Sequence, residues 1–303
     1  NWSYPLCSLI AMGLTPLISA EWNWRVQLLI PAILSLIATA LAWRYFPESP
    51  RWLESRGRYQ EAEKVMRSIE EGVIRQTGKP LPPVVIADDG KAPQAVPYSA
   101  LLTGVLLKRV ILGSCVLIAM NVVQYTLINW LPTIFMTQGI NLKDSIVLNT
   151  MSMFGAPFGI FIAMLVMDKI PRKTMGVGLL ILIAVLGYIY SLQTSMLLIT
   201  LIGFFLITFV YMYVCYASAV YVPEIWPTEA KLRGSGLANA VGRISGIAAP
   251  YAVAVLLSSY GVTGVFILLG AVSIVVAIAI ATIGIETKGV SVESLSIDAV
   301  ANK

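Results

Sequence analysis

Long runs of hydrophobic residues, separated by short polar segments, dominate the chain. Most runs contain about 20 residues, the length that an α-helix needs to cross a ~30 Å hydrocarbon layer. The pattern therefore predicts an all-α polytopic membrane protein with eight transmembrane helices. We place these helices at residues 5–20, 26–46, 110–130, 146–167, 174–190, 196–222, 234–259 and 262–285.

One long hydrophilic region, residues 47–109, follows the second predicted span. Within it, apolar side chains recur at helical spacing over residues 58–71 and predict an amphipathic helix. Prolines and glycines are frequent over residues 72–97, which favours a flexible linker. If this region joins two equal halves, as in carriers built from parallel repeats, four further spans precede residue 1. The expected domains are the last two helices of an N-terminal bundle (1–46), a cytoplasmic linker (47–109), a six-helix C-terminal bundle (110–285) and a tail (286–303).

Composition narrows the possible functions. The chain is 57% hydrophobic and 12% charged, about half the charge of a typical soluble domain. It contains no histidine, which excludes His-dependent nucleophilic triads and His-ligated metal sites within this sequence. Its three cysteines lie in apolar runs without metal-ligand spacing and are interpreted as packing residues. We expect no enzymatic activity, no cofactor and no metal.

The positive charge is distributed unevenly along the chain. Of the 21 lysines and arginines, 18 lie in residues 44–109, in the links at 168–173 and 228–233, or after residue 286. The links on the opposite side hold only Arg25 and Lys143. By the positive-inside rule, the long loop and the C-terminus are cytoplasmic. The same rule explains the net charge of +5 without a nucleic-acid partner.

Four motifs beside the predicted spans resemble those of the major facilitator superfamily, most closely its sugar-porter-like and organic-acid or metabolite symporter branches. The resemblance covers the whole chain and implies helices five to twelve of twelve, alternating access, a small-molecule substrate, H⁺ as a second partner and a monomer in the bacterial inner membrane. The sequence departs from the family pattern at Pro171 (usually Gly), at Lys231 (usually Arg) and at Ile285 (usually Pro). The motifs are FPESPRWLESRGR (46–58), MDKIPRK (167–173), PEIWPTEAKLRG (223–234) and IETKG (285–289).

The charged residues of these motifs are candidates for a latch that holds the inner gate shut. An Asp just past one helix end can accept from the free N–H groups that open a neighbouring helix. Exposed ion pairs contribute only ~0–1 kcal/mol each, which suits a gate that must open. The alternative is that these charges only set topology in solvated loops. The candidate latch residues are Glu48, Arg51, Asp168, Arg172, Glu224, Lys231, Arg233 and Glu286.

Arg243 is the only basic residue deep inside a predicted span. A cation at membrane depth costs about 2.5–3.5 kcal/mol on insertion scales, so we expect it to contact protein, water or a ligand. One interpretation makes it the counter-charge of an anionic substrate, since a guanidinium binds a carboxylate in a bidentate manner. The resemblance supports this, because a basic residue in a similar setting is implicated in the anion preference of related carriers. The alternative is a structural pairing with Glu224 or with helix carbonyls.

Further polar residues are candidates for lining a substrate cavity. In the span predicted at 110–130, Asn121, Gln124, Tyr125 and Asn129 fall on one helix face, where they could bind a substrate. The sequence Trp130-Leu131-Pro132 is expected to break that helix at the outer mouth. Hydrogen bonds between helices, and ordinary packing for the tyrosines, are the alternatives. With Arg243, the predicted substrate-binding set contains Asn121, Gln124, Tyr125, Asn129, Tyr213, Tyr216 and Asn239.

These observations predict a secondary active transporter of a small organic metabolite, with an organic acid favoured because of Arg243. No carboxylate lies in the middle of any predicted span, so a proton site would have to lie outside them. A sugar porter of the same fold and a non-transporting membrane sensor or scaffold are the alternatives.

Overall fold

The computed structural model describes residues 3–14, 17–78, 80, 97–193, 195–227 and 230–289, and within these ranges it contains helices and no strand. The chain divides into two compact units, one of residues 14–92 and the other of residues 1–13 and 93–303. The elements are α1 (Ser3–Leu14), α2 (Ala20–Tyr45), α3 (Pro50–Ser55), α4 (Tyr59–Thr77), α5 (Tyr98–Leu101), α6 (Gly104–Thr137), α7 (Leu142–Met153), α8 (Gly155–Val166), α9 (Arg172–Ser191), α10 (Met196–Cys215), the π-helix η1 (Tyr216–Tyr221), α11 (Val222–Glu224) and α12 (Lys231–Ile283).

The smaller unit contains the long apolar helix α2 and a short pair of helices, α3 and α4. Leu53 of α3 and Ala62 of α4 are buried where the two helices pack. The prediction that the amphipathic helix ends at residue 71 is wrong, because α4 continues to Thr77. Gly78 ends it in the left-handed conformation (φ 64°), which only glycine adopts without strain. Most of the predicted flexible linker, residues 79 and 81–96, lies outside the described residues.

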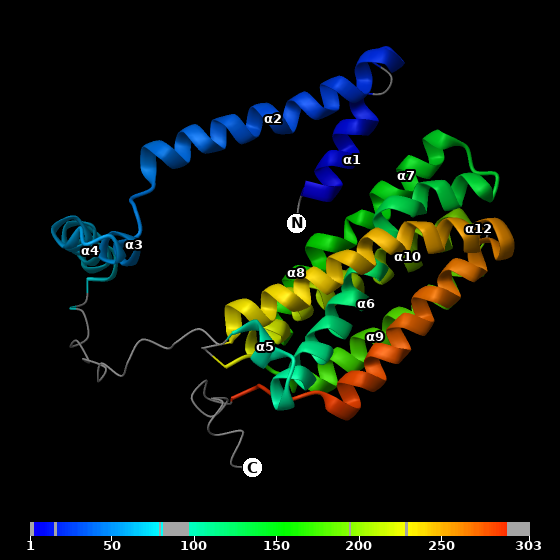
Figure 1. Ribbon diagram of the computed structural model, residues 1–303. Helices are drawn as coiled ribbons and strands as arrows, with labels where there is room; N and C mark the ends of the chain where they lie inside the picture. Colours follow the sequence, from blue (N-terminus) through cyan, green and yellow to red (C-terminus); the bar gives the residue numbers. More distant parts are fainter. Residues whose placement is uncertain are drawn as a thin grey trace. The chain divides into compact units, whose positions relative to one another are not determined.

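The larger unit is a helical bundle in which α12 packs against α6 and α9, and α10 packs against α7, α8 and α9 (Figure 1). Although α12 is continuous over 53 residues, Gly261 has non-helical angles (φ 64°, ψ −160°) and reverses its direction. Figure 1 shows the two halves of α12 as antiparallel neighbours. The two spans predicted at 234–259 and 262–285 are therefore distinct, and a glycine separates them because a side chain would strain this turn.

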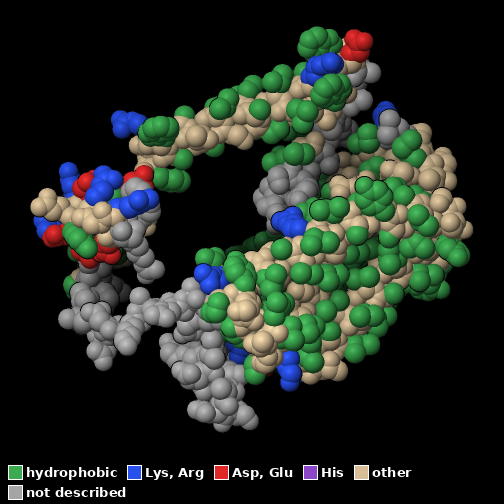
Figure 2. Space-filling model, viewed as in Figure 1, with side chains coloured by type: hydrophobic (Ala, Val, Ile, Leu, Met, Phe, Trp, Pro, Cys, Tyr) green, Lys and Arg blue, Asp and Glu red, His purple; other side chains and the backbone are tan. Residues whose placement is uncertain are grey.

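Six helical segments among the described residues are long and apolar enough to cross a membrane, and the last of them is this bent helix. The first predicted span, residues 5–20, is not one of them. In that region α1 has 12 residues, and residues 15 and 16 lie outside the described ones, so this span stays a prediction. Hydrophobic side chains cover the visible face of the bundle and of α2, while charged side chains gather on α3 and α4 (Figure 2).

Prolines and glycines shape the bundle in ways that were only partly predicted. The expected helix break at Pro132 is wrong, because α6 continues through it to Thr137. A membrane helix tolerates one proline where neighbouring groups satisfy the freed carbonyl. A helix boundary lies near Pro157, since α7 ends at Met153 and α8 starts at Gly155. A side chain at Gly155 or Gly159 would collide with the backbone of α10, so these glycines permit the close contact.

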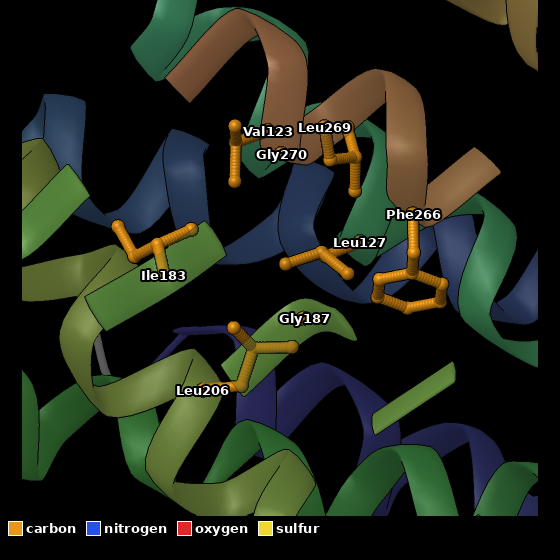
Figure 3. A pocket seen from close by; sticks show the side chains of 8 residues that line it. All are labelled: Val123, Leu127, Ile183, Gly187, Leu206, Phe266, Leu269 and Gly270. Carbon is orange, nitrogen blue, oxygen red and sulfur yellow. The ribbon is translucent and has the colours of Figure 1, made fainter. Parts of the chain in front are cut away.

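The interior of the bundle is closely packed. One small cavity of about 10 Å³ lies between α6, α9, α10 and the second half of α12 (Figure 3). Its lining is entirely apolar, as the side chains of Val123, Ile183, Leu206 and Phe266 illustrate. A void of this size is at the limit for one water molecule and offers no polar partner, so it is a packing defect and not a ligand site.

Candidate functional site

Arg172, the first residue of α9, is the centre of a charged cluster at one end of the bundle. Its Nε and Nη2 donate to the two carboxylate oxygens of Glu224, both at 3.1 Å. A third donor, Nη1, contacts the carbonyl oxygen of Met167, and Nη2 also lies 3.4 Å from Asp168. Only 7% of the Arg172 side chain is exposed, compared with 34% for Glu224. This is a bidentate, largely desolvated ion pair, the geometry in which guanidinium–carboxylate pairs are strongest. We call Asp168, Arg172, Glu224 and Glu286 the Arg172 cluster.

Glu286 caps α9 from a distant part of the chain. Its Oε1 accepts from the backbone N–H of Arg172 at 2.7 Å and its Oε2 from that of Lys173 at 3.1 Å. These are two of the N–H groups that the first turn of a helix leaves unpaired, and Pro171 before them has no side chain that could cap them. The cap is therefore supplied by Glu286, and not by an Asp as expected from the sequence. Asp168, the acidic residue beside the helix, is instead 89% exposed.

The environment of Glu286 favours its charged form. Partial burial of the carboxyl raises its pKa, but the backbone N–H groups of Arg172, Lys173 and Lys288 together outweigh burial. The positive charge of Arg172 acts in the same direction. The net result is that the pKa of Glu286 lies below its ordinary value of 4.5.

Two residues that follow Glu286 complete the cluster, and the sequence analysis did not assign them a role. The hydroxyl of Thr287 donates to Glu224 Oε2 at 2.5 Å. The ammonium group of Lys288 donates to the carbonyl oxygen of Lys169 at 2.7 Å. Both belong to the IETKG motif, so their position beside Glu286 is the signal that could have found them.

The other candidate latch residues are not brought into this cluster. Lys231 is exposed at the first residue of α12 and pairs with no carboxylate in the part of the chain that the structure describes. Arg233 lies with its guanidinium 5.3 Å from the centre of the Tyr98 ring, a cation–π contact. Glu48 is exposed in the smaller unit, and Arg51 lies in α3 of that unit, with a side chain outside the described ones.

Arg243 lies in the first half of α12 and is exposed, along a stripe that continues through Ile247 and Tyr251. We call this stripe, with Asn239 one turn before it, the open face. Nη1 of Arg243 donates to the hydroxyl oxygen of Tyr125 on α6. No carboxylate among the described residues pairs with Arg243. The predicted alternative, a structural pair with Glu224, does not form, because Glu224 is bound to Arg172.

Two glycines allow α6 to approach this part of α12. A Cβ atom at Gly242 would lie 2.9 Å from Asn121 Nδ2 and 2.9 Å from Leu117 Cβ. A Cβ atom at Gly246 would lie 3.2 Å from the Tyr125 ring. The ring is thus seated against Gly246, which places its hydroxyl beside Arg243. Side chains at the two glycine positions would push the helices apart and separate this pair.

The remaining polar candidates are divided between this region and the helix interior. Asn121 is buried; its Nδ2 donates to the carbonyl of Leu117 in its own helix at 2.7 Å, and its Oδ1 has no partner among the described residues. Asn129 is exposed on α6 and Gln124 is half-buried. Asn239 is exposed, with Nδ2 bonded to the carbonyl of Ser235 one turn back at 2.9 Å. Of the candidates, Tyr125, Asn239 and Arg243 therefore lie together most clearly.

Tyr213 and Tyr216 are not exposed to any cavity in this structure. Both are fully buried, and the Tyr213 hydroxyl donates to the carbonyl of Val116 on α6 at 3.1 Å. The ring of Tyr216 lies against Gly176 of α9, where no side chain would fit. These contacts describe packing between helices, the alternative role considered for the tyrosines. Side-chain direction in a π-helix could not be predicted from α-helical spacing.

Comparison with known proteins gives one family match and several relatives. Residues 5–299 match the family model described as "Sugar (and other) transporter". An inner membrane metabolite transport protein of Escherichia coli, YdjE, is 44% identical over 298 residues, 98% of this chain and 65% of the relative. The putative metabolite transport protein YyaJ of Bacillus subtilis is 29% identical over 88% of this chain and 58% of its own length. The niacin transporter NiaP of Acinetobacter baylyi is 25% identical over 95% of this chain and 65% of its own length.

Two of the solved structures that match are of XylE. A double tryptophan mutant of it superposes with a TM-score of 0.67 at 18% identity, over 96% of this chain and 63% of that structure. The major facilitator superfamily proton:xylose symporter XylE bound to 6-bromo-6-deoxy-D-glucose gives 0.58 at 22% identity, with the same coverage. At these identities the likeness concerns the fold, and it confirms the predicted helical bundle. The chain spans about two thirds or less of the length of these relatives and structures.

Proposed function

Because this chain belongs to the sugar (and other) transporter family of the major facilitator superfamily, we propose that it forms part of a secondary carrier that moves a small organic acid across the inner membrane by alternating access. The observation that carries the proposal is the pairing of Arg243 with Tyr125. A phenol accepts a hydrogen bond from the guanidinium but does not neutralise it. The positive charge and the remaining N–H donors stay available to an anion on the open face.

The proposed substrate-binding residues are the eight polar candidates, ranked by the structure. Arg243, Tyr125 and Asn239 are proposed to contact substrate in the present arrangement. Gln124, Asn129 and the free Oδ1 of Asn121 extend the polar surface along α6. Tyr213 and Tyr216 would join only if α10 moved away from α6 and α9.

A carboxylate substrate also agrees with the name of one relative. Niacin, which names the relative in Acinetobacter baylyi, is an aromatic carboxylic acid. Other relatives are named for arabinose and protons, or for organic cations and carnitine, so relationship alone does not select a substrate class. The charge on the open face supports an anionic substrate, because neither a neutral sugar nor a cation needs a free guanidinium.

In this proposal the Arg172 cluster is the cytoplasmic latch. It ties together the starts or ends of α9, α11 and α12 through groups that lie far apart in sequence. The long loop and the C-terminal tail are proposed to lie in the cytoplasm, in line with the distribution of lysine and arginine. The proposed proton coupling would use a titratable group outside the described spans, because their middle portions contain no carboxylate.

Uptake by the full-length protein in proteoliposomes tests the substrate class. Labelled carboxylates, their neutral primary amides and sugars would be compared in the unaltered protein and in Arg243→Ala, Arg243→Lys and the control Arg67→Ala, whose side chain is exposed on α4. We expect Arg243→Ala to lose carboxylate uptake at least about tenfold, the effect of one charge-assisted hydrogen bond. Arg243→Lys should retain part of it, and amide uptake should not change.

Three outcomes contradict the proposal. Unchanged carboxylate uptake in both Arg243 variants would show that this charge does not bind the substrate. Uptake of sugars and not of carboxylates by the unaltered protein would favour the sugar porter. Ligand binding without counterflow in the same vesicles would favour a non-transporting sensor.

A further inference from the structure

Tyr221 holds one residue of a distant segment by both of its backbone polar groups. The N–H of Ile285 donates to the Tyr221 hydroxyl oxygen at 3.0 Å, and the hydroxyl donates to the carbonyl oxygen of Ile285 at 3.1 Å. The two residues are 64 positions apart in sequence. Tyr221 is fully buried, so its hydroxyl can exchange these partners for water only if the end of α10 opens.

The segment held in this way, residues 284–289, is the one that reaches the Arg172 cluster. The residue directly after Ile285 is Glu286, which caps α9. Thr287 then bonds Glu224 and Lys288 bonds the carbonyl of Lys169. Because neighbouring residues share a rigid peptide unit, fixing residue 285 restricts the direction in which the Glu286 carboxylate can point.

Tyr221 is also the last residue of the π-helix η1, and its ring is part of a stack. It lies 5.0 Å from the ring of Tyr216 with an interplanar angle of 15°, and Tyr216 lies 5.7 Å from Tyr213. Tyr213 in turn donates to the carbonyl of Val116 on α6. The π-helical turn therefore aligns three tyrosines between α6 and residues 284–289, and such turns are frequent at functional sites.

We propose that the Tyr221 hydroxyl is an uncharged component of the latch that positions Glu286 at the start of α9. Residue 285 takes part through its N–H, which a proline, the usual residue at this place in the similar family motif, does not have. The role in gating rests on the proposed function, whereas the positioning of Glu286 does not. The sequence departure at Ile285 thus adds a contact to the latch.

Hydrogen–deuterium exchange of the full-length protein, followed in the peptide that contains Arg172 and Lys173, tests this inference. The amides of both residues donate to Glu286 and report whether the cap is in place. In Tyr221→Phe the ring remains and both hydrogen bonds to residue 285 are lost. We expect exchange at this peptide to become about tenfold faster. Tyr188→Phe, which alters an exposed tyrosine of α9, should leave it unchanged.

A second pair of variants tests the role of the N–H. Ile285→Pro removes the donor and keeps the carbonyl, while Ile285→Val keeps both. Gly284 has φ −63° and ψ 147°, a conformation that a following proline permits. We expect Ile285→Pro to accelerate exchange less than Tyr221→Phe, and Ile285→Val not at all. The double variant should equal Tyr221→Phe, because the hydroxyl that pairs with the N–H is already absent.

Unchanged exchange in Tyr221→Phe would overturn the inference, as would equal effects of Ile285→Pro and Ile285→Val. This readout needs no substrate. A protein that fails to carry organic acids can therefore still confirm the positioning of Glu286. Conversely, a carrier of organic acids whose exchange is insensitive to Tyr221 would retain the proposed function and lose this inference.

Discussion

Arg172 and Arg243 are both arginines at the edge of, or inside, an apolar helix, and they differ entirely in their partners. Arg172 is 7% exposed and gives two donors to Glu224, a third to a backbone carbonyl and a weak contact to Asp168. Arg243 is exposed and bonds only a neutral phenol among the described residues. The first charge is neutralised within the protein, and the second remains available. The comparison shows that partners, and not residue type or apolar context, separate a structural arginine from a candidate binding residue.

The largest effect should follow from the change that breaks the neutralised pair. Arg172→Ala leaves Glu224 without its cation and removes a contact to Met167. We expect a loss of about 2 kcal/mol in the free energy of unfolding, below the range for fully buried pairs because Glu224 is one-third exposed. Chemical denaturation of the purified protein in detergent would measure it.

The matched control for this change is Arg67→Ala. Arg67 pairs with Glu63 at 3.0 Å on α4, with side chains 68% and 72% exposed. Its removal should change stability by less than about 0.5 kcal/mol. Equal losses in Arg67→Ala and Arg172→Ala would show that burial does not distinguish the two pairs.

The next effect concerns the other arginine. Tyr125→Phe keeps the ring against Gly246 and removes the acceptor that orients Arg243. We expect the apparent KM for a carboxylate substrate to rise about fivefold, the effect of one hydrogen bond of ~1 kcal/mol, with uptake of the neutral amide unaltered. Tyr188→Phe, which alters an exposed tyrosine of α9 away from the open face, is the control. A similar rise for the amide would indicate altered helix packing in place of lost orientation of Arg243.

A smaller effect is expected from pH. The pKa of Glu286 in the folded protein is below the ordinary 4.5, so its contribution to stability is complete above pH 4.5. It is lost as the pH falls below 4.5 and through the lower pKa of the folded state. Hydrogen exchange at Arg172 and Lys173, corrected for the intrinsic rate, should therefore accelerate over that range. Glu286→Gln should remove most of this pH dependence, and an unaltered profile would contradict the capping role.

The smallest effect is expected for the stability of an Arg243 variant. Arg243→Gln should change the free energy of unfolding by less than about 0.5 kcal/mol, because the side chain is exposed and its one partner is uncharged. Denaturation under the conditions used for Arg172→Ala would measure it. A loss as large as that of Arg172→Ala would make Arg243 a structural residue and weaken the proposed anion site.

Much of the fold was predictable because membrane spans are encoded locally. The length of the hydrophobic runs alone located the six helical segments that could cross a membrane. Two glycines with positive φ mark changes of direction: Gly261 reverses α12, and Gly78 ends α4. The prediction of a helix break at Pro132 was wrong because it rested on the low helix propensity of proline alone. The helix α6 continues through Pro132 to Thr137, and a membrane helix tolerates a proline where neighbouring groups satisfy the freed backbone.

The site was predictable in its components and not in its connections. The motifs indicated that Arg172, Glu224 and Glu286 belong together, but not that Glu286 caps α9 while Glu224 binds the guanidinium. The role of Tyr221 could not be predicted from the sequence, because it depends on a π-helical turn and on the backbone of Ile285, 64 residues away. For Tyr213 in α10 and Tyr216 in the π-helix, the structure shows the alternative role, packing between helices.

The amino-acid sequence by itself determined that this is a helical membrane protein and which charged residues are available for chemistry. These properties follow from the transfer of each residue between water and hydrocarbon, which depends on composition and local order. The tertiary structure alone decided which of the two arginines is neutralised. That outcome depends on the distances between groups from different helices, and no local pattern in the chain specifies those distances.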